Sequence, residues 1–140
     1  MEKVIILQPL IALGLWTGVM MIWMYATRIP AMTAAGIDPQ NGQHPHQLAD
    51  GLPSEVARIA DNYNHLFEQP TLFYATLISI AVLGHGDNLA VQLAWAFVAL
   101  RVVHSLVQAT FNKVLLRFGI FIVSWAVLLV LIVREALIIF

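Results

Sequence analysis

Four polar side chains lie along one side of an otherwise apolar segment, and they are the strongest chemical signal in the sequence. They are Arg101, His104, Gln108 and Asn112, and their spacing of i, i+3, i+7 and i+11 is that of one helical face. A charge at the depth of Arg101 in lipid costs at least about 2.5–3.5 kcal/mol, so the residue must face a bundle interior or a wet cavity. The pattern predicts an intramembrane site, with a buried polar network between helices as the structural alternative.

An earlier segment carries two further sets of polar residues just before its apolar part. One side of the expected helix holds Arg58, Asn62, His65 and Gln69, and a neighbouring side holds Asp61, Asn64 and Glu68. Glu68 lies at the edge of the apolar run and is the natural counter-ion for Arg101 or Arg58. Pro70 removes a backbone hydrogen bond, so it is expected to kink the helix or expose a carbonyl there.

Three weaker signals lie elsewhere in the chain. Arg28 ends the first apolar segment, where it either reaches lipid headgroups or binds an anion at the mouth of the bundle. Gly14 and Gly18 form a G-x-x-x-G pattern that favours close approach of another helix. His44 and His46 lack a third ligand at helical spacing, so no metal site is predicted.

The composition places these residues in a membrane. The chain has 140 residues, of which 60% are hydrophobic and only 11% charged, with a mean hydropathy of +0.81, whereas soluble domains carry about 25% charged residues. The net charge of −1 gives no basic stripe and argues against a nucleic-acid partner. The absence of cysteine excludes disulfides, thiolate metal ligands and a cysteine nucleophile.

Four segments are long and apolar enough to span a bilayer, within one membrane domain of residues 1–140. The expected spans are residues 4–27, 55–84, 88–111 and 114–138. The first run is longer than the apolar part of a signal peptide, and residues 29–53, rich in Pro, Gly, Gln, Asn and His, are expected to form an irregular loop. Short joints between the later spans favour antiparallel neighbours, so we expect an all-α, up-down four-helix bundle.

The distribution of Lys and Arg predicts the orientation. One membrane face carries Arg28, Arg58, Lys113 and Arg117, and the other carries Lys3 and Arg134. The more basic face is expected in the cytoplasm, which places both termini outside it.

This layout resembles the MAPEG family, the membrane-associated proteins in eicosanoid and glutathione metabolism. In the third span the family pattern Arg-x-x-(Tyr or His)-x-x-x-Tyr is similar to Arg101, His104 and Gln108, with Gln108 where the family has tyrosine. A further family arginine after this helix is similar to Arg117.

The family pattern of the second span, Arg-x-x-x-Asn-x-x-Glu-x-x-Pro, is matched in part. One register aligns Asn64 and Pro70, and then Glu68 stands one residue late. The other register aligns Arg58 and Asn62. A shift of one residue turns a helical side chain by about 100°, so neither register reproduces the whole pattern.

The resemblance implies a homotrimer of bacterial type, in an inner membrane, that binds glutathione between subunits near the cytoplasmic side. It would conjugate glutathione or a related thiol to apolar electrophiles, or reduce lipid hydroperoxides, with substrates entering from the bilayer. Thiol activation would then involve Arg101, His104 and Arg117. Contacts to the peptide would come from Arg28, Arg58, Asn62, Asn64, Glu68 and Gln108.

Two other interpretations remain open at the level of sequence. A non-catalytic member could use the same pocket for a lipid or a partner complex, and Gln108 in place of tyrosine favours this alternative. A small proton-handling protein could instead use Arg101, Glu68 and His104 as a relay. A thiol-dependent turnover assay separates the enzyme from both.

Overall fold

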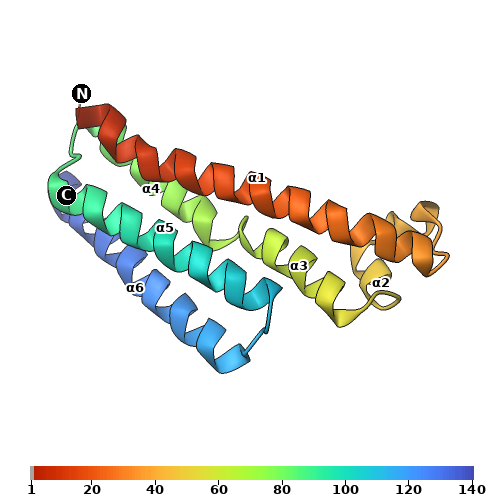
Figure 1. Cartoon of the computed structure of the whole chain (residues 1–140). Helices are drawn as coiled ribbons and strands as arrows, with labels where there is room; N and C mark the ends of the chain where they lie inside the picture. The colour runs from red at the N-terminus through yellow and green to blue at the C-terminus, as the bar shows by residue number, and fades with distance from the viewer. Residues whose placement is uncertain (1) are drawn as a thin grey trace.

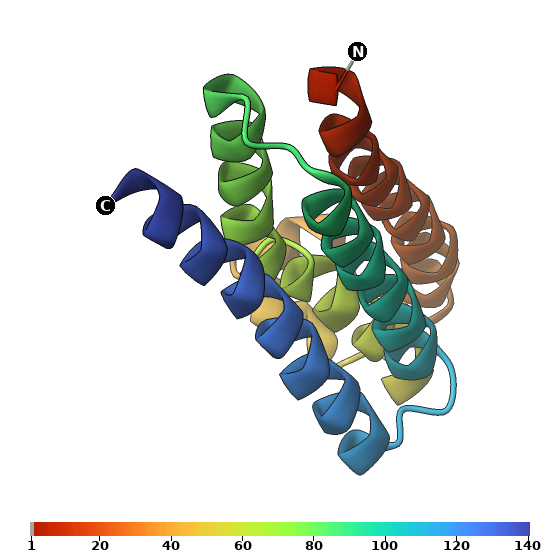
Figure 2. The ribbon, with the colours of Figure 1, turned by 90° about the vertical axis from the view of Figure 1, so that its left-hand side faces the viewer.

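The computed structural model describes residues 2–140, and the secondary structure of this part of the chain is entirely helical. The elements are α1 (Glu2–Ala34), η1 (Pro39–Gln43), α2 (Pro45–Ala49), α3 (Ser54–His65), α4 (Gln69–Leu83), α5 (Asn88–Ala109) and α6 (Val114–Ile139). Figure 1 shows α1, the α3–α4 pair, α5 and α6 running lengthwise in alternating directions. Both chain ends lie at one end of the bundle, and the view in Figure 2 agrees.

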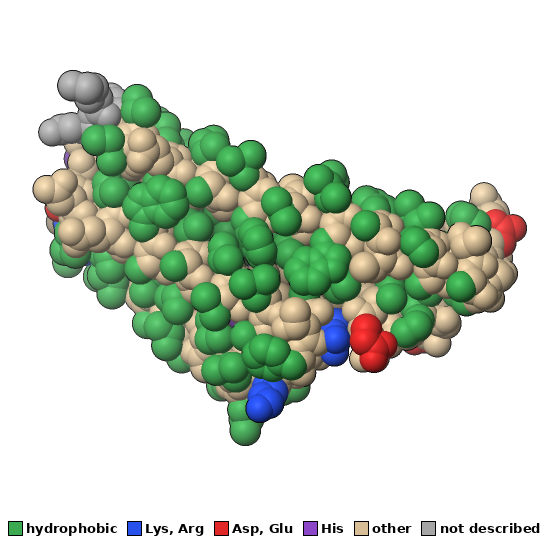
Figure 3. All heavy atoms as spheres, in the orientation of Figure 1, with side chains coloured by type: hydrophobic (Ala, Val, Ile, Leu, Met, Phe, Trp, Pro, Cys, Tyr) green, Lys and Arg blue, Asp and Glu red, His purple; other side chains and the backbone are tan. Residues whose placement is uncertain are grey.

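The expected all-helical bundle with four candidate membrane spans is confirmed. The spans are Val4–Ala34, Ser54–Leu83, Asn88–Ala109 and Val114–Ile139. Their outward surfaces are strongly apolar. Figure 3 shows hydrophobic side chains along the whole visible face, with charged side chains near α3, at the α5–α6 joint and at the end beside η1. Such a surface suits lipid, because a soluble monomer rarely exposes large contiguous apolar patches.

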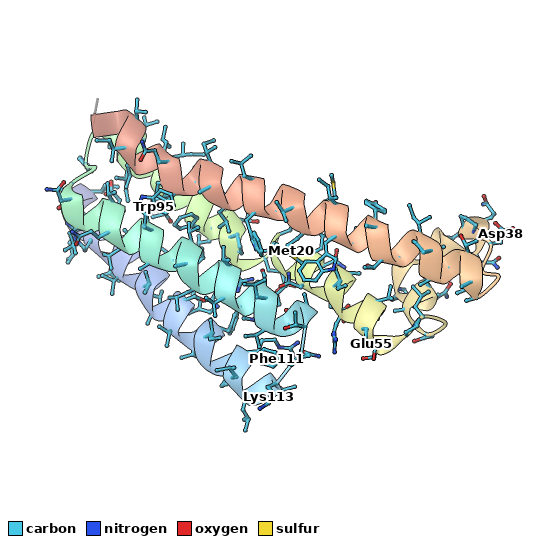
Figure 4. All side chains as sticks on the ribbon, viewed as in Figure 1. Met20, Asp38, Glu55, Trp95, Phe111 and Lys113 are labelled. Atoms are coloured by element: carbon cyan, nitrogen blue, oxygen red, sulfur yellow. The ribbon has the colours of Figure 1, made fainter. Side chains whose placement is uncertain are left out.

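The core lies between α1 and the other long helices. Ile6, Leu13 and Met20 recur every seven residues along α1, and all three side chains are fully buried. Met20 is labelled in Figure 4 on the side of α1 that faces the bundle. Deeper in the bundle, Phe73 of α4 stacks on Phe97 of α5 with ring centroids 4.3 Å apart. This ring contact joins α4 to α5 in the core, while α5 packs along its length mainly against α6 and α1, which positions its polar residues.

The first loop is more helical than its composition suggests. Helix α1 continues to Ala34, whereas the sequence places the end of this span near residue 27. Gly36, two residues after the end of the helix, has a left-handed φ of 64°, and the amide of Ile37 donates to the carbonyl of Met32 at 3.0 Å. This is a Schellman motif, which satisfies carbonyls that the last turn would leave unpaired.

The second span is interrupted rather than kinked. Helix α3 ends at His65 and α4 begins at Gln69, and Glu68 between them has a φ of −90° and a ψ of −95°. Pro70 lies in the first turn of α4, where its missing N–H needs no partner. The break is visible in Figure 1, and it directs the side chain at the start of α4 towards α5 and α6.

Candidate functional site

Arg101 is the centre of a buried polar cluster in the middle of the bundle. Its side chain has 0% exposure, Nη1 donates to Oε1 of Gln69 at 3.3 Å, and Nη2 donates to Nδ1 of His65 at 3.0 Å. Because a guanidinium only donates, His65 accepts at Nδ1 and carries its proton on Nε2. Among residues 2–140, no carboxylate forms an ion pair with Arg101, and its Nε has no partner.

Gln69 links this arginine to α6. Its Oε1 accepts from Arg101 and lies 3.1 Å from Oγ of Ser124. The same hydroxyl lies 2.8 Å from the carbonyl oxygen of Phe121, so it can donate to either acceptor. The break between α3 and α4 therefore places one amide where it can join α4, α5 and α6.

A small pocket opens beside the cluster, at the end where α5 passes into α6. Its volume is about 190 Å³, and its lining residues are His65, His104, Val114, Arg117, Phe118 and Phe121. The two imidazole centroids are 5.1 Å apart. Arg117 is held at the rim by a hydrogen bond from Nη1 to Oδ1 of Asn112, 2.9 Å long. The pocket thus combines two imidazoles and one guanidinium with aromatic walls.

Several buried polar atoms along the contact between α3 and α5 have no hydrogen-bond partner within the described chain. They are Oδ1 and Nδ2 of Asn62, Nε of Arg58, Nδ1 of His104, Oγ of Ser105 and Oε1 of Gln108. A buried donor or acceptor without a partner costs about 1–3 kcal/mol. A native structure holds few such atoms, and each calls for an explanation such as a ligand, an ion or an ordered water. This clustering makes the contact a candidate binding region, where a ligand or ordered water would supply the missing partners.

The predicted site residues fall into separate groups in the structure. Arg101, His104, Arg117, Gln108, Asn62 and Arg58 lie on the α3, α5 and α6 side. Arg28 and Asn64 instead line a second pocket between α1, α2 and α3, with a volume of about 400 Å³.

Glu68 does not pair with Arg101 or Arg58. It is exposed at the α3–α4 break, and its side chain forms no hydrogen bond or ion pair within residues 2–140. The backbone turns at this residue, so the helical spacing that placed Glu68 beside the arginines does not hold. A proton relay through Arg101, Glu68 and His104 would need the Glu68 carboxylate within ion-pair distance of Arg101, and no such ion pair is present among residues 2–140.

Three residues that the structure places in the cluster around Arg101 were not among the site residues predicted from the sequence. Two of them, His65 and Gln69, were visible as members of the same polar stripe as Asn62. Ser124 had a weaker signal, as the only hydroxyl in the apolar helix α6. The described residues contain no group of three or more His, Cys, Asp or Glu side chains that could hold a metal ion.

The opposite end of the bundle holds a second polar cluster, which we call the turn clasp: His85, Asp87, Arg134 and Glu135. Nδ1 of His85 lies 2.7 Å from Oε1 of Glu135, and Nη2 of Arg134 lies 2.6 Å from Oδ2 of Asp87. Asp87 also caps α5 by accepting from the amide of Ala90 at 2.8 Å. The hydrogen bond from Arg134, followed by that from Ala90, lowers the pKa of Asp87.

The geometry and the comparisons agree on the class of protein. Four apolar helices that enclose a buried arginine cluster define an integral membrane protein. The model of the MAPEG family matches residues 6–137. The chain therefore belongs to the MAPEG family, the membrane-associated proteins in eicosanoid and glutathione metabolism. The comparison with curated proteins and the comparison with solved structures each gave no significant match.

Proposed function

We propose that this protein binds glutathione, or a related thiol, beside Arg101 and conjugates it through its sulfur to apolar electrophiles or uses it to reduce lipid hydroperoxides. The observation that carries the proposal is the state of Arg101. Within residues 2–140, this fully buried guanidinium has only neutral hydrogen-bond partners, Gln69 and His65, and one donor has none. A buried charge without a counter-ion is strongly unfavourable, and a thiolate or carboxylate would supply the missing negative charge.

The residues of the cluster suit such a ligand. Glutathione has two carboxylates that guanidinium groups match. Arg117 lines the pocket beside the Arg101 cluster, and Arg58 lies on the face of α3 that also carries Asn62 and His65. The peptide groups of glutathione need donors and acceptors, which the unpartnered amides of Asn62 and Gln108 can provide. Arg28 and Asn64 are not part of this proposal, because they line the other pocket. Glu68 is exposed and forms no ion pair within residues 2–140, and its charge acts on Arg101 and His65 from beyond ion-pair distance.

The chemistry follows from the position of the pocket. The thiolate is the nucleophile, so the site must remove the thiol proton and stabilise the anion. In the proposal Nδ1 of His104, which has no partner within residues 2–140, accepts the proton, and Arg101 stabilises the sulfur anion. With an aryl chloride, a C–S bond then forms, the C–Cl bond breaks, and chloride leaves. With a hydroperoxide, two thiols yield one disulfide, one alcohol and one water.

The size of the pocket supports an assembly of subunits. Ligand pockets usually measure about 300–1,000 Å³, and the pocket beside Arg101 has only about 190 Å³. In the proposal the rest of glutathione lies against a neighbouring chain of a homotrimer, near the cytoplasmic side of a bacterial inner membrane, with both termini outside the cytoplasm.

One observation favours a second candidate, a non-catalytic member that binds the thiol or a lipid without turnover. Gln108 stands where the family has a tyrosine, and it is buried with 4% exposure. The pocket beside Arg101 is lined by no tyrosine, so no phenol there could hold a thiolate.

The test is conjugation of glutathione to 1-chloro-2,4-dinitrobenzene by the detergent-purified protein. We expect thioether formation that requires both glutathione and the protein. In Arg101→Met this formation should be lost. Arg134→Met is the matched control, because Arg134 lies in the turn clasp. Saturable glutathione binding without turnover would favour the non-catalytic candidate, and the absence of both would refute the proposal.

A further inference from the structure

We propose that the side of the bundle formed by α1, α2, α3 and α4 binds a phospholipid with a zwitterionic headgroup of the phosphoethanolamine type. This site is distinct from the Arg101 cluster and does not depend on the proposed thiol chemistry. It has two parts, a charged pocket for the headgroup and an apolar groove for the acyl chains.

The headgroup pocket carries opposite charges that do not neutralise each other. It has a volume of about 400 Å³, and its polar lining residues are Arg28, His46, Asp61 and Asn64. Within residues 2–140, Arg28 and Asp61 form no ion pair although both face this hollow. A ligand with a phosphate and an ammonium group would match both charges, with the phosphate at Arg28 and the ammonium group at Asp61.

The apolar groove lies between α1 and α4. It has a volume of about 900 Å³, and among its lining residues are Leu10, Gly14, Gly18, Phe67 and Tyr74. A Cβ atom placed on Gly14 or Gly18 would meet nothing within 4 Å, so the glycines open the groove and do not pack against a helix of this chain. A hollow of this size and polarity suits hydrocarbon chains.

Helical geometry places the pocket and the groove on the same side. Leu10, Gly14 and Met21 project from α1 within about 40° of Arg28, and Met21 is about 10 Å from Arg28 along the helix axis. On the other wall, Asn64 lines the pocket and Phe67 lines the groove, only three residues later. A glycerol backbone can bridge such a separation, so one lipid molecule can occupy both parts.

Native mass spectrometry of the full-length protein in detergent tests the headgroup pocket. We expect retention of phosphatidylethanolamine over phosphatidylglycerol of the same acyl chains. Asp61→Asn should reduce that preference about fivefold, the effect of one charge contact at a membrane surface. Glu55→Gln is the control, since Glu55 is exposed on α3 outside both parts of the site. Equal retention of the two lipids by the wild type, or an unchanged preference in Asp61→Asn, would overturn the proposal.

The groove is tested with Gly18→Leu, which should fill it and weaken lipid retention about tenfold. Leucine favours a helix more than glycine does, so the variant should fold. Gly119→Leu is matched to it, because a Cβ there also meets nothing within 4 Å and Gly119 lies on α6 away from the groove. A change of oligomeric state in Gly18→Leu with lipid retention intact would show that a second copy of the chain covers the groove, and would overturn the lipid assignment. Equally tight binding of glycerophosphoethanolamine, which has no acyl chains, would overturn it as well.

Discussion

The turn clasp and the Arg101 cluster contain similar side chains, but only the clasp is paired. In the clasp, Asp87 and Glu135 lie within 2.7 Å of Arg134 and His85. Around Arg101, the hydrogen-bond partners are neutral, and several buried polar atoms have no partner within the described part of the chain. Paired groups at a helix joint stabilise a fold, whereas unpaired buried groups lower stability and persist where a function needs them. From this difference we propose that the clasp stabilises the fold and that the Arg101 cluster binds a ligand.

The largest expected effect is at Arg101. Arg101→Met should lower glutathione-dependent turnover at least 100-fold, equivalent to about 2.7 kcal/mol of transition-state stabilisation. The same variant should be as stable as the wild type or more stable, since an apolar side chain of similar volume removes an uncompensated buried charge. Initial rates and thermal unfolding measured on the same preparations provide the check. A large loss of stability would instead show that Arg101 holds the helices together.

Glu135 should give the opposite result. Glu135→Ala leaves His85 without its partner and should lower the free energy of unfolding by about 1–3 kcal/mol, while turnover per folded molecule stays unchanged. Thermal unfolding beside a turnover assay measures both quantities. Glu135→Gln keeps an acceptor for His85 and should recover much of the stability. A fall in turnover per folded molecule would contradict the claim that the turn clasp contributes to stability alone.

Ser105 offers a smaller and more specific test of the unpaired cluster. Its buried Oγ has no partner within the described residues, so Ser105→Ala should raise the free energy of unfolding by about 1 kcal/mol. Ser124→Ala is the matched comparison, because the hydroxyl of Ser124 can donate to Gln69 and its loss should lower stability. Chemical or thermal unfolding of the two variants compares them directly, and destabilisation by both would mean that Ser105 is satisfied after all.

The smallest effect concerns acid. The pKa of Asp87 is lowered by its bond from Arg134 and by the amide of Ala90, so its stabilising contribution is present above the unfolded value of about 3.9 and is lost as the pH falls below it. Thermal unfolding between about pH 6 and about pH 3 should therefore show a steeper acid loss in the wild type than in Asp87→Asn. Parallel pH profiles of the two proteins would show that the Asp87 carboxylate does not contribute to stability. The effect is small because Asp87 is exposed and solvent screens its charge.

The sequence predicted the fold well, because the composition and the lengths of the apolar runs left few alternatives to a membrane helical bundle. The polar stripe of α5 was also predictable, since regular helical spacing places Arg101 and His104 on one face. The hydrogen-bond partners of Arg101 could not be predicted, because they depend on the break between α3 and α4. At that break Glu68 is exposed and Gln69 is buried beside Arg101. A regular helix continued through the break would instead place Glu68 next to Arg101, which is the partner that the sequence predicted. Ser124 could not be selected either, because its role depends on how α6 packs against α4.

The most direct measurement is thermal unfolding of the detergent-purified protein across a glutathione titration, with Arg101→Met beside it. A ligand at 100 times its dissociation constant adds about 2.7 kcal/mol of stability. We expect a saturable rise in Tm for the wild type and none for Arg101→Met, while Arg134→Met retains the rise. An unchanged Tm of the wild type at millimolar glutathione, together with a marked loss of stability in Arg101→Met, would contradict this expectation and make the Arg101 cluster a structural network.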